Sequence, residues 1–460
     1  MITMTLAELA KHLAAHCTHP DITFTGLSID TRTLSPGNLF VAIVGEQFDG
    51  HDFVEEAYKN GAVAALVSRK IDSVIPQIEV TDTLHTLGQI SEIWRQRFSL
   101  PLIGVTGSNG KTTLKNMIAS ILRAHCDGSE EEVLATIGNF NNNIGLPLTL
   151  SRLNNKHRFG VIEMGMNHSG EIAYLTALAK PQIAVINNAA ESHLEGLKDV
   201  AGVARAKGEI FLGLPQNGIG ILNKDDAFFD YWRDLVATHR YLTFGLEHAA
   251  DVSATPINNN STTHQLITLQ TPSGKVDVNL PLLGKHNVMN ALAATAAALA
   301  LSIDLTAIKT GLENVEPAPG RMNQHLLPNG MRVIDDTYNA NPFSLDAAIN
   351  ALSIFSGKKI LVLGDMRELG PNAKELHSAA GQKAQAAGID HLFTLGELSE
   401  AATKSFGKNA AHFTDRKNLL AALQPHLVNG STILVKGSRS MRMEKVVAEL
   451  VPASKLSHAH

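Results

Sequence analysis

The stretch Leu102-Ile-Gly-Val-Thr-Gly-Ser-Asn-Gly-Lys-Thr-Thr113 decides the fold of this chain. It begins with an apolar run, which is typical of a buried strand, and it leads into the helical pattern Leu114–Arg123. Between these two parts, glycines let backbone N–H groups close around phosphate oxygens, and the helix presents its positive N-terminal end. The stretch therefore predicts a nucleoside triphosphate site, with Lys111 at the β- and γ-phosphates and the Thr112 hydroxyl on Mg²⁺.

One position departs from the strict phosphate-loop pattern, because Val105 stands where that pattern has a glycine. An ordinary strand-to-helix turn is the alternative, since Gly, Ser and Asn are common in turns. A turn alone does not require a lysine and two threonines at the start of a helix behind a buried strand. The phosphate-loop interpretation is therefore favoured.

Length, charge and cysteine content narrow the class of protein. A chain of 460 residues is too long for one core and predicts about three domains. The net charge of −5, without basic blocks, argues against nucleic-acid binding. The two cysteines fit a reducing compartment, the N-terminal segment lacks the parts of a secretory signal, and the alanine-rich run Ala291–Leu301 is too short to span a bilayer. We expect a cytoplasmic, monomeric protein that does not insert into membranes.

Strand and helix patterns divide the chain into three α/β units. Residues 1–84 form a small unit with short strands near Gly26–Ile29, Asn38–Val44 and Ala62–Val67. Residues 85–322 alternate strands with helices, which predicts a doubly wound, mostly parallel sheet with helices on both faces. Within them, residues 251–281 show the alternation of antiparallel strands. After a Pro/Gly segment, residues 323–460 form a second alternating, Rossmann-like unit.

The predicted strands of these units are bounded as follows. In the central unit they are Leu102–Val105, Phe159–Met164, Ile183–Asn187 and Gly218–Asn223, and in the last unit Val333–Thr337, Lys359–Gly364, His391–Thr394 and Thr432–Lys436.

Three side chains of the central unit are candidates for metal chemistry. Glu163 ends a buried strand, where an α/β sheet places metal ligands, although a helix-capping role is the alternative. His193 follows another strand, and a lone histidine is more often a packing or surface residue. Paired with Glu163, it becomes a candidate second ligand for Mg²⁺ or Mn²⁺. Lys207 lies on a predicted helix and, by composition alone, is a solvated charge.

Two motifs concern the base of the nucleotide. Asn223-Lys-Asp-Asp226 matches the guanine-reading motif of GTP-dependent switches, which is an alternative function for the chain. Such a switch also needs Asp-x-x-Gly after the next strand, and this chain has Glu163-Met-Gly there. Asn287 and Asn290 share one helical face, and their amides suit the edge of an adenine ring. Helix capping is the alternative for Asn287.

Three loops of the last unit follow predicted strands. They are Asp335–Pro342, Gly364–Gly370 and Lys436–Ser440, and they are dense in hydrogen-bonding side chains. Because loops at the carboxyl ends of parallel strands bind ligands in α/β sheets, we expect all three to face a ligand.

Taken together, these motifs resemble those of the Mur ligases, the ATP-dependent amide-forming enzymes of peptidoglycan precursor synthesis. The resemblance covers essentially the whole chain, and Val105 agrees with the shorter phosphate loop of that family. The motifs in family order are Thr106–Thr113, Glu163–Gly165, Asn187–His193, Ala206–Ile210, His286–Asn290 and Pro319–Arg321.

Other segments resemble one branch of this family, the one that adds D-alanyl-D-alanine to UDP-N-acetylmuramoyl-tripeptide. These segments are Ser28–Arg32, Phe48–Phe53, Gly138–Pro147, Asp336–Pro342, Gly364–Gly370 and Val435–Ser440. A sister Mur ligase and a folylpolyglutamate synthetase are the alternatives among enzymes. The resemblance implies ATP, two Mg²⁺ ions and an acyl-phosphate intermediate. It also implies a UDP-substrate domain at 1–84, an ATP-binding domain at 85–322 and a ligase domain at 323–460.

The resemblance further implies roles for individual residues. Lys111, Glu163, His193 and Lys207 would be catalytic, with Thr112, Glu163 and His193 on the metal ions. Lys207 would react with CO₂ to give a carbamate that supports the second ion. The implied nucleotide-binding residues are Gly107, Ser108, Asn109, Gly110, Lys111, Thr112, Thr113, Asn287, Asn290, Arg321, Asp336 and Tyr338. The implied substrate-binding residues are Ser28, Asp30, Arg32, Asn139, Asn142, Asn341, Lys436, Ser438 and Arg439.

Overall fold

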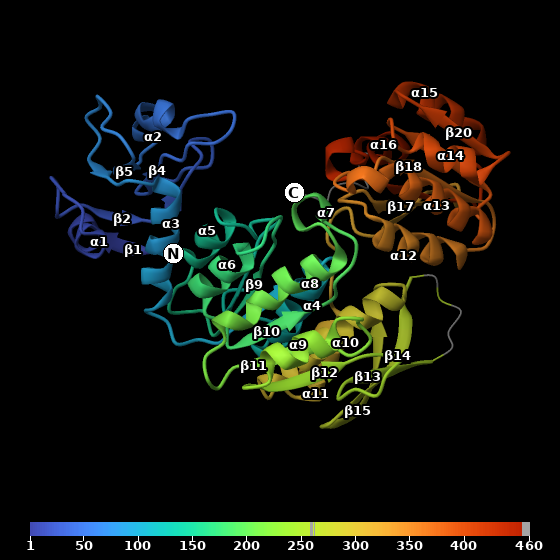
Figure 1. The fold of residues 1–460 in the computed structure, drawn as a ribbon, viewed down its shortest axis with the longest axis horizontal. Coiled ribbons are helices and arrows are strands. Elements are labelled where there is room, and N and C mark those ends of the chain that lie inside the picture. The colour runs from blue at the N-terminus through green and yellow to red at the C-terminus, as the bar shows by residue number, and fades with distance from the viewer. Residues whose placement is uncertain (258–260, 262, 453–460) are drawn as a thin grey trace.

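The computed structural model describes residues 1–257, 261 and 263–452, which fold into three α/β units in chain order. In Figure 1 the N-terminal unit (blue) and the C-terminal unit (orange to red) lie on opposite sides, both above the central unit. The predicted α/β fold class is confirmed. No helix among the described residues is long and apolar enough to cross a membrane.

The N-terminal unit is built on a small parallel sheet in the order β3-β4-β5-β6. Its strands are β3 (Leu27–Ser28), β4 (Leu39–Val41), β5 (Ala64–Val67) and β6 (Gln77–Glu79). The three predicted strands are confirmed, whereas β6 and the antiparallel pair β1 (Thr3–Thr5) and β2 (Thr23–Thr25) were not predicted. The unit also holds α1 (Leu6–Leu13) and α2 (Val54–Lys59), and α3 (Thr83–Arg95) leads into the central unit.

The central sheet has six strands, all parallel, in the order β12-β11-β10-β7-β9-β8. The strands are β7 (Leu102–Thr106), β8 (Val133–Ala135), β9 (Phe159–Glu163), β10 (Ile183–Ile186), β11 (Ile219–Asn223) and β12 (Arg240–Phe244). The strand β7 lies in the middle, between β9 and β10, and the chain passes from one side of it to the other. Such a switch point is where doubly wound sheets bind ligands.

Alternating side chains of this sheet enter two different cores, which explains why helices cover both faces. Leu102 packs with α3, α5 and α6 on one face, and Ile103 packs with α4, α10 and α11 on the other. The helices are α4 (Lys111–His125), α5 (Gly145–Leu150), α6 (Glu171–Ala179), α7 (Leu194–Leu197), α8 (Val200–Gly208), α9 (Phe229–Val236), α10 (Lys285–Ala300) and α11 (Leu305–Glu313). The predicted antiparallel segment is confirmed as β13 (Ser253–Ile257), β14 (Gln265–Thr271) and β15 (Gly274–Leu280).

The C-terminal unit repeats this plan with the strand order β16-β17-β21-β18-β19-β20, in which β16 alone is antiparallel to its neighbour. The strands are β16 (Asn323–Leu326), β17 (Arg332–Asp336), β18 (Lys359–Gly364), β19 (His391–Leu395), β20 (Ala410–Phe413) and β21 (Thr432–Lys436). The helices are α12 (Pro342–Ser353), α13 (Ala373–Ala386), α14 (Glu400–Phe406), α15 (Arg416–Leu423) and α16 (Glu444–Leu450). All four predicted strands are confirmed.

The predicted domain boundaries after residues 84 and 322 stay a prediction. The helix α3 spans the first of them, and β16 begins directly after the second.

Candidate active site

The phosphate loop connects β7 to α4, as the sequence predicts. Gly110 ends the loop with φ at +78°, a conformation that favours glycine. A Cβ atom on Gly110 would lie only 2.5 Å from Oδ1 of Asn290, so the packing requires glycine as well. The ammonium of Lys111 donates to the carbonyl of Gly107 at 2.7 Å and therefore stays folded over the loop.

Asparagine side chains from the segment after β10 and from α10 hold this loop in place. The amide of Asn187, after β10, donates to the Asn109 carbonyl at 2.9 Å and to Oδ1 of Asn290 at 2.7 Å. The amide of Asn290 in turn donates to Oδ1 of Asn287 at 3.2 Å. Asn287 and Asn290 are both buried, and these contacts support the loop, so their predicted contact with adenine stays a prediction.

Glu163 lies at the carboxyl end of β9, beside the phosphate loop. Its side chain is buried, and its Oε1 accepts a hydrogen bond from Asn141 at 2.8 Å. Its Oε2 is buried without a hydrogen-bond partner in the part of the chain that the structure describes. A buried carboxylate oxygen without a partner is energetically costly, and a cation would remove that cost.

Lys115, one turn after Lys111 on α4, is a buried cation that the sequence analysis missed. Its ammonium donates to the Thr136 carbonyl at 2.7 Å, and the Thr136 hydroxyl accepts from the Glu163 backbone at 3.0 Å. Burial lowers the pKa of Lys115, and the charge of Glu163 partly offsets this effect. Burial lowers the pKa of Lys111 in the same way, again opposed by Glu163. The site therefore gathers two lysines around one carboxylate.

Lys207 is not the solvated helix charge that its composition suggests. It lies on α8 and is 2% exposed, and its ammonium has no hydrogen bond or ion pair among the described residues. Burial lowers its pKa well below the usual range, and the charge of Lys111 lowers it further, whereas Asp226 acts in the opposite direction. The Lys207 side chain is therefore a buried amine whose surroundings disfavour its charged form.

Asp226 was predicted only as part of a nucleobase motif, but in the structure its side chain binds backbone N–H groups of the protein. Its carboxylate accepts from the backbone of Ala189 at 2.8 Å and from that of Phe228 at 2.9 Å. Asn223 of the same motif donates to the Asn187 carbonyl at 2.9 Å. Both side chains hold the loop after β10, so the guanine-reading interpretation loses its support.

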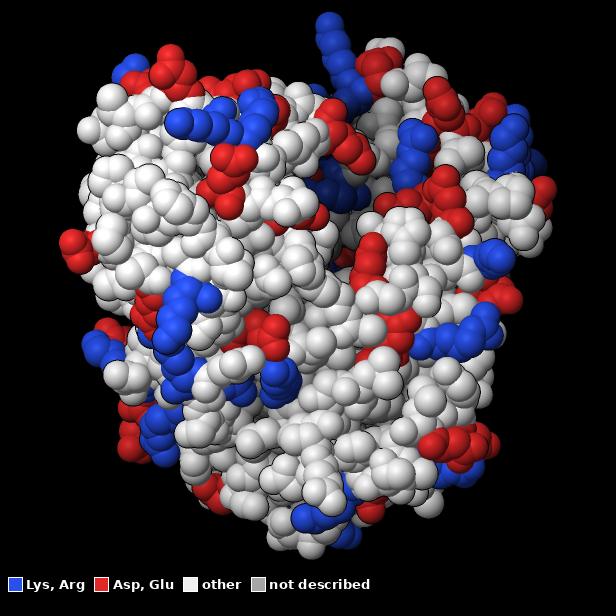
Figure 2. Space-filling model, turned by 60° about the vertical axis from the view of Figure 1, so that its left-hand side comes forward, with Lys and Arg blue, Asp and Glu red and all other residues white. Residues whose placement is uncertain are grey.

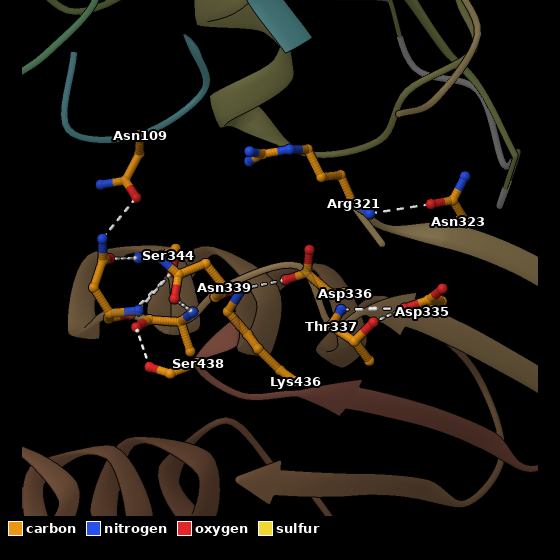
Figure 3. A network of polar contacts seen from close by, with 12 residues as sticks. Asn109, Arg321, Asn323, Asp335, Asp336, Thr337, Asn339, Ser344, Lys436 and Ser438 are labelled. Atoms are coloured by element: carbon orange, nitrogen blue, oxygen red, sulfur yellow. Dashed lines mark hydrogen bonds and ion pairs between the residues drawn. The ribbon is translucent and has the colours of Figure 1, made fainter. Parts of the chain in front are cut away.

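The C-terminal unit reaches the phosphate loop through polar side chains (Figure 3). Asn341 donates to Oδ1 of Asn109 at 2.9 Å and also caps the first turn of α12. Arg321 donates to the Thr112 hydroxyl at 3.1 Å, and its guanidinium lies 4.2 Å from the centre of the Tyr338 ring. The contacts of Asn341 with Asn109 and of Arg321 with Tyr338 connect the central unit to the C-terminal unit.

Behind these contacts, Lys436 and Asp336 form a buried ion pair at 2.5 Å between β21 and β17. Lys436 also donates to the Asn339 carbonyl at 2.9 Å, and the hydroxyl of Ser438 accepts from the backbone of Arg367 at 2.8 Å. The sequence analysis expected Asp336 at the nucleotide and Lys436 at the substrate, but it did not foresee that they pair. Removing one partner would leave the other charge buried.

His193 and Glu368 form a third contact between the two units. His193 precedes α7, and its Nδ1 lies 3.1 Å from the Oε2 atom of Glu368, in the loop after β18. Both residues line the cavity described below. Among the described residues there is no ready group of three His, Cys, Asp or Glu side chains that could hold a metal ion.

A cavity of about 850 Å³ lies where the carboxyl ends of the central and C-terminal sheets meet. Figure 2 shows a hollow in the surface that has Lys and Arg side chains inside it, as anionic ligands require. The predicted site residues that line the cavity are Ser108, Asn109, Gly110, Lys111, Thr113, Asn139, Asn142, Glu163, His193, Asn287, Asn290, Arg321, Asp336, Tyr338, Asn341, Lys436, Ser438 and Arg439.

Six predicted residues are not among those that line this cavity. Three of them contact or face residues of the cavity wall from behind: Gly107, Thr112 and Lys207. Gly107 accepts from Lys111, Thr112 accepts from Arg321, and the charge of Lys111 acts on Lys207. Ser28, Asp30 and Arg32 lie in the N-terminal unit, where Arg32 pairs with Asp30 at 2.6 Å and lowers the pKa of that carboxyl to about 2. Their contact with substrate stays a prediction.

Comparison with known proteins gives consistent matches along the chain. The family models described as Mur ligase family, catalytic domain, Mur ligase middle domain, and Mur ligase, glutamate ligase domain match residues 23–92, 105–298 and 320–439. The UDP-N-acetylmuramoyl-tripeptide–D-alanyl-D-alanine ligase of Escherichia coli (strain K12) is 44% identical over 453 residues, which cover 98% of this chain and 99% of the relative.

Solved structures agree with these matches. A crystal structure of MurF from Acinetobacter baumannii is similar with a TM-score of 0.92 and 35% identity, covering 98% of this chain and 99% of that one. The MurF ligase of Thermotoga maritima, solved in complex with ADP, has a TM-score of 0.80 and 28% identity, covering 92% of this chain and 96% of that one.

Proposed function

Since this chain belongs to the Mur ligase family, we propose that it is an ATP-dependent ligase that joins D-alanyl-D-alanine to UDP-N-acetylmuramoyl-tripeptide. The products are ADP, phosphate and UDP-N-acetylmuramoyl-pentapeptide. The observation that carries the proposal is the cavity between the two sheets. One wall is a phosphate loop, and the opposite wall consists of the three polar loops of the C-terminal unit.

The reaction joins groups that repel one another. The terminal carboxylate of the tripeptide attacks the γ-phosphate of ATP, so an oxygen–phosphorus bond forms while the bond to ADP breaks. The amine of D-alanyl-D-alanine then attacks the acyl carbon, loses a proton and displaces phosphate. Lys111 and the N-terminal end of α4 stabilise the negative charge that develops on the phosphoryl group.

The residues of the central unit fit a divalent cation at this position. The support is the buried Oε2 of Glu163 that has no partner, with Thr112 on the adjoining loop and His193 on the cavity wall. Mg²⁺ bound there would supply positive charge against the triphosphate and the carboxylate. We expect two such ions, held by Thr112, Glu163 and His193 together with oxygens of ATP.

Lys207 suits the carbamate that the family resemblance implies. Only a neutral amine attacks CO₂, and burial lowers the pKa of Lys207, which favours that form. A nitrogen–carbon bond forms, a proton leaves, and the side chain becomes an anion that can support a metal ion. As an anion, the side chain would attract the Lys111 ammonium, which disfavours a protonated Lys207.

We assign the remaining roles by unit. Residues 1–84 hold the UDP end of the acceptor, residues 85–322 hold ATP with adenine beside Asn287 and Asn290, and residues 323–460 hold the dipeptide. An acyl phosphate is destroyed by water, so the contacts between the central and C-terminal units serve to enclose it. We expect the enzyme to work as a monomer in the cytoplasm.

Phosphate release should depend on the amine that is offered. With ATP, Mg²⁺ and UDP-N-acetylmuramoyl-tripeptide, D-alanyl-D-alanine should support rapid release, whereas D-alanine, L-lysine and L-glutamate should give rates near background. Replacement of ATP by GTP should lower the rate, because Asn223 and Asp226 are used to hold a loop. Continuous detection of phosphate provides the measurement.

Two results would contradict the proposal. A preference for a single amino acid over the dipeptide would indicate a sister ligase. Turnover with GTP that equals or exceeds turnover with ATP would indicate a GTP-dependent protein instead of an ATP-dependent ligase.

A further inference from the structure

The loop after β18 presents a single carboxylate, that of Glu368, to the central unit. The loop is rigid because it is tied at several points. The buried carboxylate of Asp365 accepts from three backbone N–H groups of residues 397–399, at 2.9–3.0 Å. The backbone of Met366 donates to Nε2 of the buried His377 at 2.9 Å. The backbone of Arg367 donates to the hydroxyl of Ser438.

The partner of Glu368 is equally well anchored. His193 ends the loop after β10, which is bonded to the phosphate loop. Ser108 donates its backbone N–H to the Asn188 carbonyl at 3.0 Å, and its hydroxyl accepts from the Ala190 backbone at 2.9 Å. The position of His193 is therefore fixed relative to the phosphates that the loop is expected to bind.

The backbone at both partners is strained. His193 and Glu368 both have left-handed conformations, with φ of +53° and +63°, which non-glycine residues seldom adopt. Such strain persists only where the surroundings enforce it, and it is common at ligand sites. An exposed ion pair contributes little to stability, so stability does not explain why two strained residues meet here.

The geometry of the pair leaves one ring nitrogen available. The Glu368 carboxylate lies 3.1 Å from Nδ1 of His193, so the tautomer with its proton on Nδ1 would face this acceptor and leave the lone pair on Nε2. A metal-binding histidine normally donates its second N–H to a carboxylate, which fixes the tautomer and the ring orientation. In this chain that carboxylate comes from a different unit.

We propose that Glu368 is a positioning residue for His193: by accepting a hydrogen bond from Nδ1–H across the interface, it prepares Nε2 to bind the divalent cation. The proposal rests on the proposed function, because that function requires the metal ion. It adds that the metal site is completed by the docking of the C-terminal unit. Metal affinity and the closure of these two units are therefore coupled.

The test measures metal binding without turnover. The full chain is titrated with Mn²⁺ in the presence of a non-hydrolysable ATP analogue, and free Mn²⁺ is followed by electron paramagnetic resonance. Glu368→Ala should raise the Kd for Mn²⁺ about 10–100-fold, the usual effect of losing such a partner. Glu368→Gln keeps an acceptor oxygen and should have a smaller effect. Thermal melting establishes that the variants fold.

Two further variants show whether Glu368 acts through His193. Glu397→Ala removes another exposed carboxylate of the same unit that does not line the cavity, and it should leave the Kd unchanged. In a His193→Ala background, Glu368→Ala should have no additional effect on the Kd.

The outcomes separate this proposal from the proposed function. Unchanged Mn²⁺ affinity in folded Glu368→Ala would overturn the positioning role and leave the ligase assignment intact. An equal loss in Glu397→Ala, or a full additional loss in the His193→Ala background, would also overturn it. A wild-type chain that binds neither the analogue nor Mn²⁺ would contradict both proposals.

Discussion

Replacement of Lys111 by alanine should lower kcat about a hundredfold or more, while the protein remains folded. The ammonium of Lys111 lies over the phosphate loop, and its charge matters most when negative charge develops on the transferred phosphoryl group. Loss of one donor in a site of this kind costs about 2.7–4 kcal/mol of transition-state stabilisation. Phosphate release under saturating substrates measures the effect.

Lys309→Ala is a suitable control for this experiment, because Lys309 is a cation of the same unit that pairs with Glu313 on α11, away from the cavity. Its activity should be close to that of the wild type. If Lys111→Ala kept near-normal turnover, the lysine would be only a structural part of the loop.

Replacement of Lys207 by alanine should also remove most activity, although its side chain does not line the cavity. If Lys207 carries a carbamate, the variant loses an anion that supports the metal site, and the protein should fold normally. A small carboxylate such as acetate should restore part of the activity by occupying the vacated space. Activity with and without acetate, together with thermal melting, provides the measurement.

The alternative for Lys207 has a different signature. A lysine that served only to pack α8 would give a variant with normal kcat and a change confined to stability. Crystallography of the wild type with nucleotide and Mg²⁺ in a closed form gives an independent result, because a bare ammonium at Lys207 in that state would exclude the carbamate.

The sequence predicted the four inner strands of each large sheet, because buried parallel strands are continuous apolar runs. It also predicted the polar residues at the carboxyl ends of these strands, since Glu163 is the last residue of β9 and His193 lies in the loop that follows β10. The four edge strands β8, β12, β16 and β20 were missed, because three to five residues at the edge of a sheet carry no such run.

Properties that depend on distant residues could not be predicted from local pattern. Burial of Lys207 depends on how α8 packs, and composition alone indicated the opposite. The pairing of Asp336 with Lys436 joins residues 100 positions apart. Glu368 was visible within a loop motif, but its partner His193 lies in another unit, and only the assembled structure brings them together.

The central claim is that this chain activates the tripeptide carboxylate with ATP and transfers it to D-alanyl-D-alanine. The most direct test supplies UDP-N-acetylmuramoyl-tripeptide labelled with ¹⁸O in its terminal carboxylate, together with ATP, Mg²⁺ and the dipeptide, and analyses both products by mass spectrometry. We expect UDP-N-acetylmuramoyl-pentapeptide and phosphate that carries one ¹⁸O atom from the carboxylate. Phosphate without the label, or phosphate release without formation of the pentapeptide, would contradict it.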